Sequence, residues 1–160
     1  MERFTLPYGN QKSLEHGCLM NSNRILEIYE DFAKARMDRI SEILDEKIDF
    51  ISHAPIDVFP YLGRRRGRVE VLEALAEVHD KLEVLSFWPL TTVVDGDQAA
   101  LTVLINVKDR TTGKTANFLA AHFLRFRNNL MVEYRAIIDS MDAVRQMSTK
   151  AAERATRAEN

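Results

Sequence analysis

The chain has little of several features on which common classes of protein depend. It contains one cysteine, Cys18, among 160 residues, which excludes an internal disulfide and a cysteine metal cluster and suits a reducing compartment. No apolar run approaches the roughly 20 residues needed to cross a bilayer. The first 20 residues lack the basic start and apolar core of a secretion signal. Together these absences predict a soluble, cytoplasmic protein with no membrane partner.

An excess of positive charge is also missing. The net charge is −2 at pH 7 and the isoelectric point is about 6.1, whereas a dedicated nucleic-acid-binding domain is usually clearly basic. The one basic run, Arg64–Arg66 with Arg68, has no interleaved aromatic residues. We interpret it as a solvated loop or a partner of acidic residues on the preceding helix; a guard against anionic ligands is the alternative. The sequence predicts no nucleic-acid partner.

Signals for a metal or a phosphate-bearing cofactor are missing too. The four histidines, His16, His53, His79 and His122, are scattered, and no pair has ligand spacing on one face. No glycine-rich phosphate loop is present. We therefore expect no metal and no cofactor.

Apolar residues, by contrast, are plentiful. They make up 46% of the chain, which at this length supplies the core of one domain. Residues 1–21 show no periodicity and residues 148–160 are polar and helix-prone. We expect a flexible N-terminal arm at 1–21, a single domain at 22–147 and a polar C-terminal extension at 148–160. Met20 is an alternative natural start, which would make residues 1–19 an addition.

Helical spacing comes first along the chain and strand alternation follows. One amphipathic pattern starts at the cap residues Asn21-Ser22-Asn23 and continues to Leu44; a second covers about residues 69–82. A short strand is expected at 48–51, and the longer strands are expected at 84–94, 99–108, 118–127 and 130–138. Asn128-Asn129 suits a two-residue hairpin turn, and Asp139 is expected to cap a last helix. This order predicts an α+β fold, a cone-shaped curved antiparallel sheet with helices packed on its concave face, enclosing a pocket.

Two segments carry a resemblance to a known family. HAPIDVFPYLGRRRGRVEVLEAL and HFLRFRNNLMVEYRAIIDSMDAVRQM resemble the SnoaL-like polyketide cyclases of the nuclear-transport-factor-2-like superfamily, which also contains ketosteroid isomerase and limonene epoxide hydrolase. The first is similar to the family's His-x-Pro, Pro-x-x-Gly and Arg-Gly pattern. The second is similar to its His-x-x-x-Phe strand, turn and aromatic-Arg strand ending in Asp. The resemblance covers about residues 24–147 and implies the cone fold, while activity varies widely on such a fold.

The sequence departs from this family at the residues that carry its chemistry. The resemblance puts the catalytic aspartate of the last strand at Ala136, whose methyl group cannot exchange a proton. It also puts the epoxide hydrolase's arginine and second aspartate at Leu104 and Asn106, which excludes an Asp-Arg-Asp epoxide hydrolase. The base of ketosteroid isomerase falls beside Asp57, which remains a displaced candidate.

Three residues are the candidate proton carriers. His122 shares a strand face with Phe118, and the resemblance puts the matching histidine in the cavity; the alternative is a core histidine satisfied by one neighbour. His53 stands where the family pattern has a cavity histidine, and a surface loop is the alternative. We expect an open cavity that holds His122 and Tyr134 together with at least one of His53 and Asp57.

Further residues are candidates for binding a ligand rather than for moving protons. Tyr61 and Tyr134 suit hydrogen-bond donation to a carbonyl or an enolate, or else fill space with satisfied hydroxyls. Trp88 is expected in the cavity wall or in a dimer interface. The ligand-binding set is completed by Asn106 and by Phe118.

The leading hypothesis is a protein that binds a small, mostly apolar, carbonyl-bearing molecule and catalyses acid–base cyclisation, isomerisation or dehydration. The alternatives are a non-catalytic ligand-binding module, which Ala136 favours, and a dimeric interaction module. Apolar residues on the outer sheet face predict a homodimer through that face. The residues assigned to that face are Leu101, Val103, Ile105, Val107, Leu119, Ala121 and Phe123.

Overall fold

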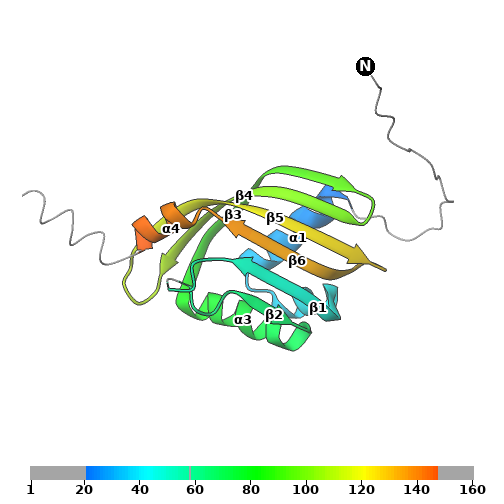
Figure 1. The fold of residues 1–160 in the computed structure, drawn as a ribbon, viewed down its shortest axis with the longest axis horizontal. Helices are drawn as coiled ribbons and strands as arrows, with labels where there is room; N and C mark the ends of the chain where they lie inside the picture. Colours follow the sequence, from blue (N-terminus) through cyan, green and yellow to red (C-terminus); the bar gives the residue numbers. More distant parts are fainter. Residues whose placement is uncertain (1–20, 58, 148–160) are drawn as a thin grey trace, which may run out of the picture.

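A six-stranded sheet organises the computed structural model, which describes residues 21–57 and 59–147 (Figure 1). Its strands are β1 (Leu44–His53), β2 (Arg64–Arg66), β3 (Leu82–Asp95), β4 (Gln98–Asp109), β5 (Thr115–Arg127) and β6 (Leu130–Ile138). The helices are α1 (Ser22–Ala33), α2 (Met37–Ile43), α3 (Arg68–Lys81) and α4 (Ser140–Met147). The predicted N-terminal arm, apart from Asn21, and the predicted C-terminal extension lie outside the described residues.

The predicted α+β class with a curved, open sheet is confirmed, but the sheet is mixed. Its order is β2-β1-β6-β5-β4-β3. The meander from β3 to β6 is antiparallel throughout, and Asn128 and Asn129 make its last turn with φ of 51° and 63°. β1, however, pairs in parallel with β6. This pair joins segments far apart in the chain, and alternation within each strand does not encode the direction of such a partner.

The helix expected from 22 to 44 is broken into α1 and α2. Asn21 caps α1 as predicted, its side chain accepting from the backbone N–H of Arg24 at 3.0 Å. The helix stops because Ala35 adopts φ 54° and because the carboxylate of the buried Asp31 accepts a hydrogen bond at 2.8 Å from the Arg36 guanidinium. The chain then enters β1 at Leu44, earlier than the predicted strand.

Three helices contact the sheet around its concave face. α1 contacts β3 and α2 contacts β6. α3 contacts β1 and both edge strands, β2 and β3, and so spans between the two ends of the sheet. Glycine at 67 is required where α3 begins: its φ is 83°, its N–H donates to the Ile48 carbonyl at 2.8 Å, and an added Cβ would lie 3.2 Å from the Glu46 carbonyl oxygen. α4 is capped as predicted, because the Asp139 carboxylate accepts from the Asp142 N–H at 3.1 Å.

The prediction of which residues lie on the outer face of the sheet was wrong for one strand, β4. Leu101 lies opposite His122, and Ile105 lies opposite Phe118, so both belong to the concave face and not to the outer one. The same parity places Val103 and Val107 inside, and all four side chains are buried. On β5, Leu119 and Phe123 do lie on the outer face, with 50% and 47% exposure.

The basic run pairs with a strand rather than with the preceding helix. Arg64 makes two hydrogen bonds with Asp49 on the neighbouring β1, at 2.7 and 3.1 Å. Arg68 donates to the carbonyl of Leu44 at 2.9 Å. These contacts tie β2 and the start of α3 to β1.

Candidate ligand cavity

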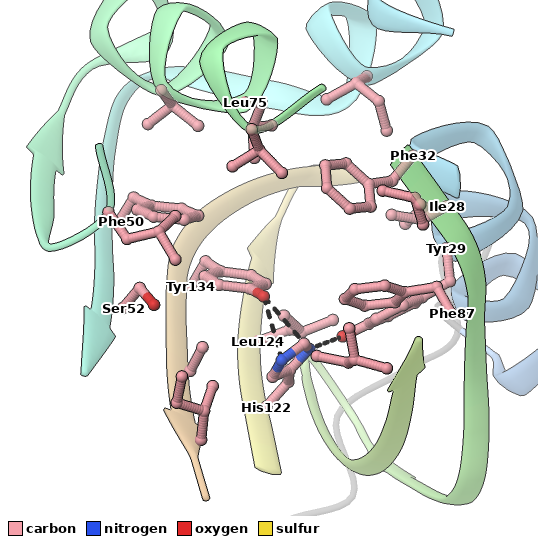
Figure 2. A pocket seen from close by; sticks show the side chains of 18 of the residues that line it. Ile28, Tyr29, Phe32, Phe50, Ser52, Leu75, Phe87, His122, Leu124 and Tyr134 are labelled. Carbon is pink, nitrogen blue, oxygen red and sulfur yellow. Dashed lines mark hydrogen bonds between the residues drawn. The ribbon is translucent and has the colours of Figure 1, made fainter. Parts of the chain in front are cut away.

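A cavity of about 140 Å³ lies between the concave face of the sheet and the helices. Its walls come from α1, α2, α3 and from β1, β3, β4, β5 and β6, with aromatic and aliphatic side chains on all sides (Figure 2). None of the described residues that line it is an aspartate, glutamate, lysine or arginine. The polar atoms inside come from one histidine, three tyrosines and one serine.

His122 occupies the centre of the polar group. Its position on β5 turns the side chain to the concave face, where it is 1% exposed. The hydroxyl of Tyr29, on α1, lies 2.6 Å from Nδ1 of the imidazole (Figure 2). The Tyr29 ring stacks on Phe87 with centroids 5.5 Å apart. Helix and sheet are thus joined inside the cavity by one short hydrogen bond.

Tyr134 reaches the same imidazole from β6. Its hydroxyl lies 3.2 Å from Nδ1 and 3.4 Å from Nε2. Distances so nearly equal mean that it is not aimed along the axis of either nitrogen, so both contacts are weak. The ring is held by Phe50, which stacks on it at 4.6 Å with an interplanar angle of 3°. Tyr134 is therefore fixed in position while its hydroxyl can still donate to another acceptor.

Burial keeps this group of side chains uncharged at neutral pH. Desolvation lowers the pKa of His122 to about 3 and raises the pKa values of Tyr29 and Tyr134 above their ordinary range. The 2.6 Å contact is typical of an O–H donor, so we assign the Tyr29 hydroxyl as donor to Nδ1. The neutral imidazole then carries its hydrogen on Nε2.

The structure brings four of the predicted site residues together. His122, Tyr134, Tyr61 and Phe118 all line the cavity and are at most intermediate in exposure. Desolvation raises the pKa of Tyr61, with Asp109 and Glu77 contributing, so this hydroxyl is also neutral. His122 and Tyr134 thus lie side by side in the lining of one cavity.

The other four predicted residues lie outside the cavity lining. His53 is exposed at the end of β1, because it is paired with Ile137 on the outer-facing row of β6. Asp57 is exposed in the following loop. The expectation that at least one of these two lines the cavity is therefore wrong.

Trp88 and Asn106 are also on the outer face. Trp88 is 66% exposed, and the amide of Asn106 donates to the Ser86 hydroxyl at 2.6 Å. A bulge in β3 between Val84 and Ser86 reverses the parity of Trp88 relative to Val84. Asn106 lies on the outer face because its neighbour on β4, Ile105, faces inward opposite Phe118. Neither residue forms a wall of the cavity.

Sequence reasoning missed two polar residues of the lining. Tyr29 belongs to the apolar stripe of α1, where it reads as a core aromatic. Ser52 is 6% exposed on β1 and lines the cavity. In the sequence, the only signal for either was an amphiphilic side chain at a core-facing position.

A family model described as a SnoaL-like domain matches residues 25–134. Among curated proteins, none matches the chain. A candidate isomerase from Rhodopseudomonas palustris is similar in structure with a TM-score of 0.71 and 26% identity, over 79% of this chain and 97% of that one.

Two further solved structures share the fold. TerC, crystallised with polyporic acid, has a TM-score of 0.69 and 18% identity over 79% of this chain and 97% of its own. An epoxide hydrolase from M. tuberculosis has a TM-score of 0.66 and 9% identity over 84% of this chain and 94% of its own. At these identities the likeness concerns the fold alone.

No group of three histidine, cysteine, aspartate or glutamate side chains within residues 21–57 and 59–147 is arranged to hold a metal ion. No helix in the same part of the chain is long and apolar enough to span a membrane.

Proposed function

We propose, because the chain belongs to the SnoaL-like domain family, that it binds a small, mostly apolar, carbonyl-bearing molecule in the conical cavity. The observation that carries this proposal is the buried contact of His122 with two tyrosine hydroxyls inside a mostly apolar enclosure. Apolar walls with a few convergent polar groups are the usual form of a small-molecule site.

The same groups support a defined kind of chemistry. With its pKa near 3, His122 is a weak base and a neutral hydrogen-bond donor at physiological pH. Tyr134 and the Nε2–H of His122 are suited to donate to a carbonyl oxygen and to stabilise an enolate developing there. Cyclisation, isomerisation and dehydration next to a carbonyl all pass through such charge. His53 and Asp57 are exposed and have no part in this proposal.

Ala136 favours a second candidate, a non-catalytic ligand-binding module. It is 3% exposed, lines the cavity, and lies opposite both Ser52 and His122. A methyl group there supplies no general base, and no carboxylate among the described lining residues replaces it. Binding is therefore proposed first, and catalysis rests on electrophilic assistance to the carbonyl.

Native mass spectrometry of the full chain tests the binding proposal. We expect the purified protein to retain, or to take up from a mixture of enones and aromatic carbonyl compounds, one neutral molecule that is released on denaturation. Thr102→Ala, on the exposed outer face of β4, is the matched control and should keep the ligand. Failure of every such compound to bind would overturn the proposal.

A measurement of turnover distinguishes an enzyme from a protein that only binds its ligand. We expect enone isomerisation or aldol-type cyclisation by the unmodified protein to fall about 100-fold in His122→Ala, the loss typical of one removed donor. Unchanged turnover in this variant would remove His122 from the mechanism. No turnover by the unmodified protein would favour the ligand-binding module.

The outer face of the sheet supports the proposal of a homodimer. Trp88, Leu119, Phe123 and Ile137 are between 47% and 66% exposed there, and such a row of half-exposed apolar residues is typical of an interface. Light scattering at micromolar concentration should give twice the chain mass of 18.4 kDa, and Phe123→Glu should shift it to the single chain. A single-chain mass for the unmodified protein would contradict the dimer.

The cytoplasm is the compartment we propose, on the single cysteine of the sequence. Fractionation of cells that express the chain should place it with cytoplasmic markers. Recovery with an oxidising compartment would contradict this assignment.

A further inference from the structure

Two neighbouring rows of side chains form the part of the cavity wall that belongs to β1, β6 and β5. One row consists of Phe50, Tyr134 and Leu124, which pair across these three strands. The next row consists of Ser52, Ala136 and His122. All six residues line the cavity. The smallest side chain, the methyl of Ala136, is thus in the middle of the second row, between the two polar residues.

This arrangement makes a depression that we call the Ala136 slot. Across the strands it is bounded by Ser52 and His122, whose Cα atoms are about 9–10 Å apart because neighbouring strands are spaced by about 4.8 Å. Along β6 it is bounded by Tyr134 and Ile138, two residues away on either side. The space over the methyl group is therefore within reach of polar groups from three strands.

The polar groups around the slot can all donate hydrogen bonds. The Ser52 hydroxyl forms no hydrogen bond with any described residue, although the side chain is 6% exposed. The Nε2–H of His122 and the hydroxyl of Tyr134 are committed only to weak mutual contacts. Three donors facing one small space call for an acceptor oxygen from the ligand. No charged side chain among the described lining residues could balance an anion, so the ligand is neutral.

The size of the cavity limits the ligand further. At about 140 Å³ it is close to the roughly 150 Å³ of an engineered apolar cavity that holds one benzene molecule. A single ring with a short substituent fills such a space. A fused polycyclic compound exceeds it.

We infer that the site selects a neutral molecule the size of one ring whose oxygen atom lies over Ala136, between Ser52 and His122. A monocyclic enone or an aromatic aldehyde has this chemistry. The inference rests on the proposed function and narrows it from carbonyl compounds in general to those of a single ring. It also assigns Ser52 and Ala136 as residues that determine specificity.

Calorimetric titration of the full chain with matched probes tests the inference. Benzaldehyde and cyclohex-2-enone should bind about tenfold more tightly than toluene, which fills the same space without an oxygen acceptor. Benzoate and 1-naphthaldehyde should bind at least about tenfold more weakly than benzaldehyde, because one carries a charge and the other a second ring. Equal affinity for 1-naphthaldehyde, benzoate or toluene would overturn the inference and leave the proposed function standing. Binding of no probe of any class would overturn the proposed function itself.

Substitutions at the Ala136 slot test where the oxygen atom of the ligand lies. Ala136→Leu fills the slot and should abolish benzaldehyde binding, whereas Ala121→Leu adds the same volume on the outward side of β5 and should not. Ser52→Ala changes little volume and should weaken benzaldehyde about three- to tenfold while leaving toluene unchanged. If Ala136→Leu fails to fold, Ala136→Val and Ser52→Ala carry the test. Unchanged benzaldehyde affinity in the folded variants would overturn the assignment.

Discussion

The concave and convex faces of the sheet are both rich in apolar residues, but they differ in how deeply those residues are buried. On β5 the concave face carries Phe118, His122 and Leu124, all at most 6% exposed, and the convex face carries Leu119 and Phe123, both about half-exposed. Both faces are rich in apolar residues. Burial therefore depends on what covers a face: α1 and α3 pack over the concave one, whereas Leu119 and Phe123 on the convex one remain about half-exposed. The helices, rather than the alternation, create the cavity.

Charge separates the two faces as clearly as burial does. The convex face carries a small ion network in which Glu133 accepts from Arg125 at 3.1 Å and from Arg135 at 3.2 Å. The concave lining carries no such pair among its described residues. The polar side chains of the concave face are all neutral. We therefore expect this face to be more sensitive than the convex face to substitutions and to added charge.

The largest difference in stability is expected between alanine substitutions of two adjacent residues whose side chains lie on opposite faces of the sheet. Phe118→Ala should lower the free energy of unfolding by about 3–5 kcal/mol, because it removes a buried ring and leaves a void. Leu119→Ala, half-exposed on the other face, should cost less than about 1 kcal/mol in the monomeric state. Urea unfolding followed by circular dichroism measures both. Equal costs would show that the two faces are alike in burial.

Acid should destabilise the fold through His122. Its pKa in the folded chain is about 3, against an ordinary value of 6.5, so between these values the unfolded chain binds a proton that the folded chain does not. Stability from this group is complete above pH 6.5 and is lost as the pH falls toward 3; between pH 7 and pH 5 the loss is about 2 kcal/mol.

His122→Gln is the control for this pH dependence. This variant should be less stable at pH 7, but its free energy of unfolding should lack the dependence on pH that His122 causes. Burial also lowers the pKa of His79, and this residue contributes equally in both proteins. Unfolding titrations at a series of pH values give the two slopes. Parallel slopes would place His122 in a solvated setting.

The two tyrosines on His122 should differ in their contribution. Tyr29→Phe breaks the 2.6 Å hydrogen bond and leaves the buried Nδ1 with only the weak contact to Tyr134, which should cost about 1–2 kcal/mol. Tyr134→Phe removes only the contacts at 3.2 and 3.4 Å and should cost less than about 1 kcal/mol. The same unfolding assay decides between them. A larger loss for Tyr134→Phe would reverse the assignment of the stronger bond.

The smallest effect is expected on the convex face. Glu133→Gln disrupts ion pairs whose partners are about half-exposed, and such pairs contribute less than about 1 kcal/mol. The difference from the unmodified protein should shrink further in 1 M salt. Thermal unfolding at low and high salt measures it; a salt-independent loss above 2 kcal/mol would mean that these charges are not solvated.

Much of the fold follows from local pattern, and less of the site does. Alternation placed His122 and Tyr134 on one face, and Asn128-Asn129 marked the turn between their strands. Alternation alone did not fix which face of β4 is the inner one: Ile105 lies opposite Phe118 on the concave face, which leaves Asn106 on the outer face. It also overlooked Tyr29, whose hydroxyl meets a histidine 93 residues away; a helix stripe identifies a core position but not its distant partner.

The insertion of β6 between β1 and β5 has a consequence for how the protein is made on the ribosome. During synthesis β1 emerges before β3, β4 and β5, but its parallel partner β6 emerges only after them. Until then β1 has only the three-residue β2 as a neighbour. A chain that terminates prematurely before Leu130 has neither the strand that joins the two parts of the sheet nor Tyr134 and Ala136. The cavity can therefore form only after β6 has been translated, and shorter nascent fragments should be clients for chaperones rather than partial binders.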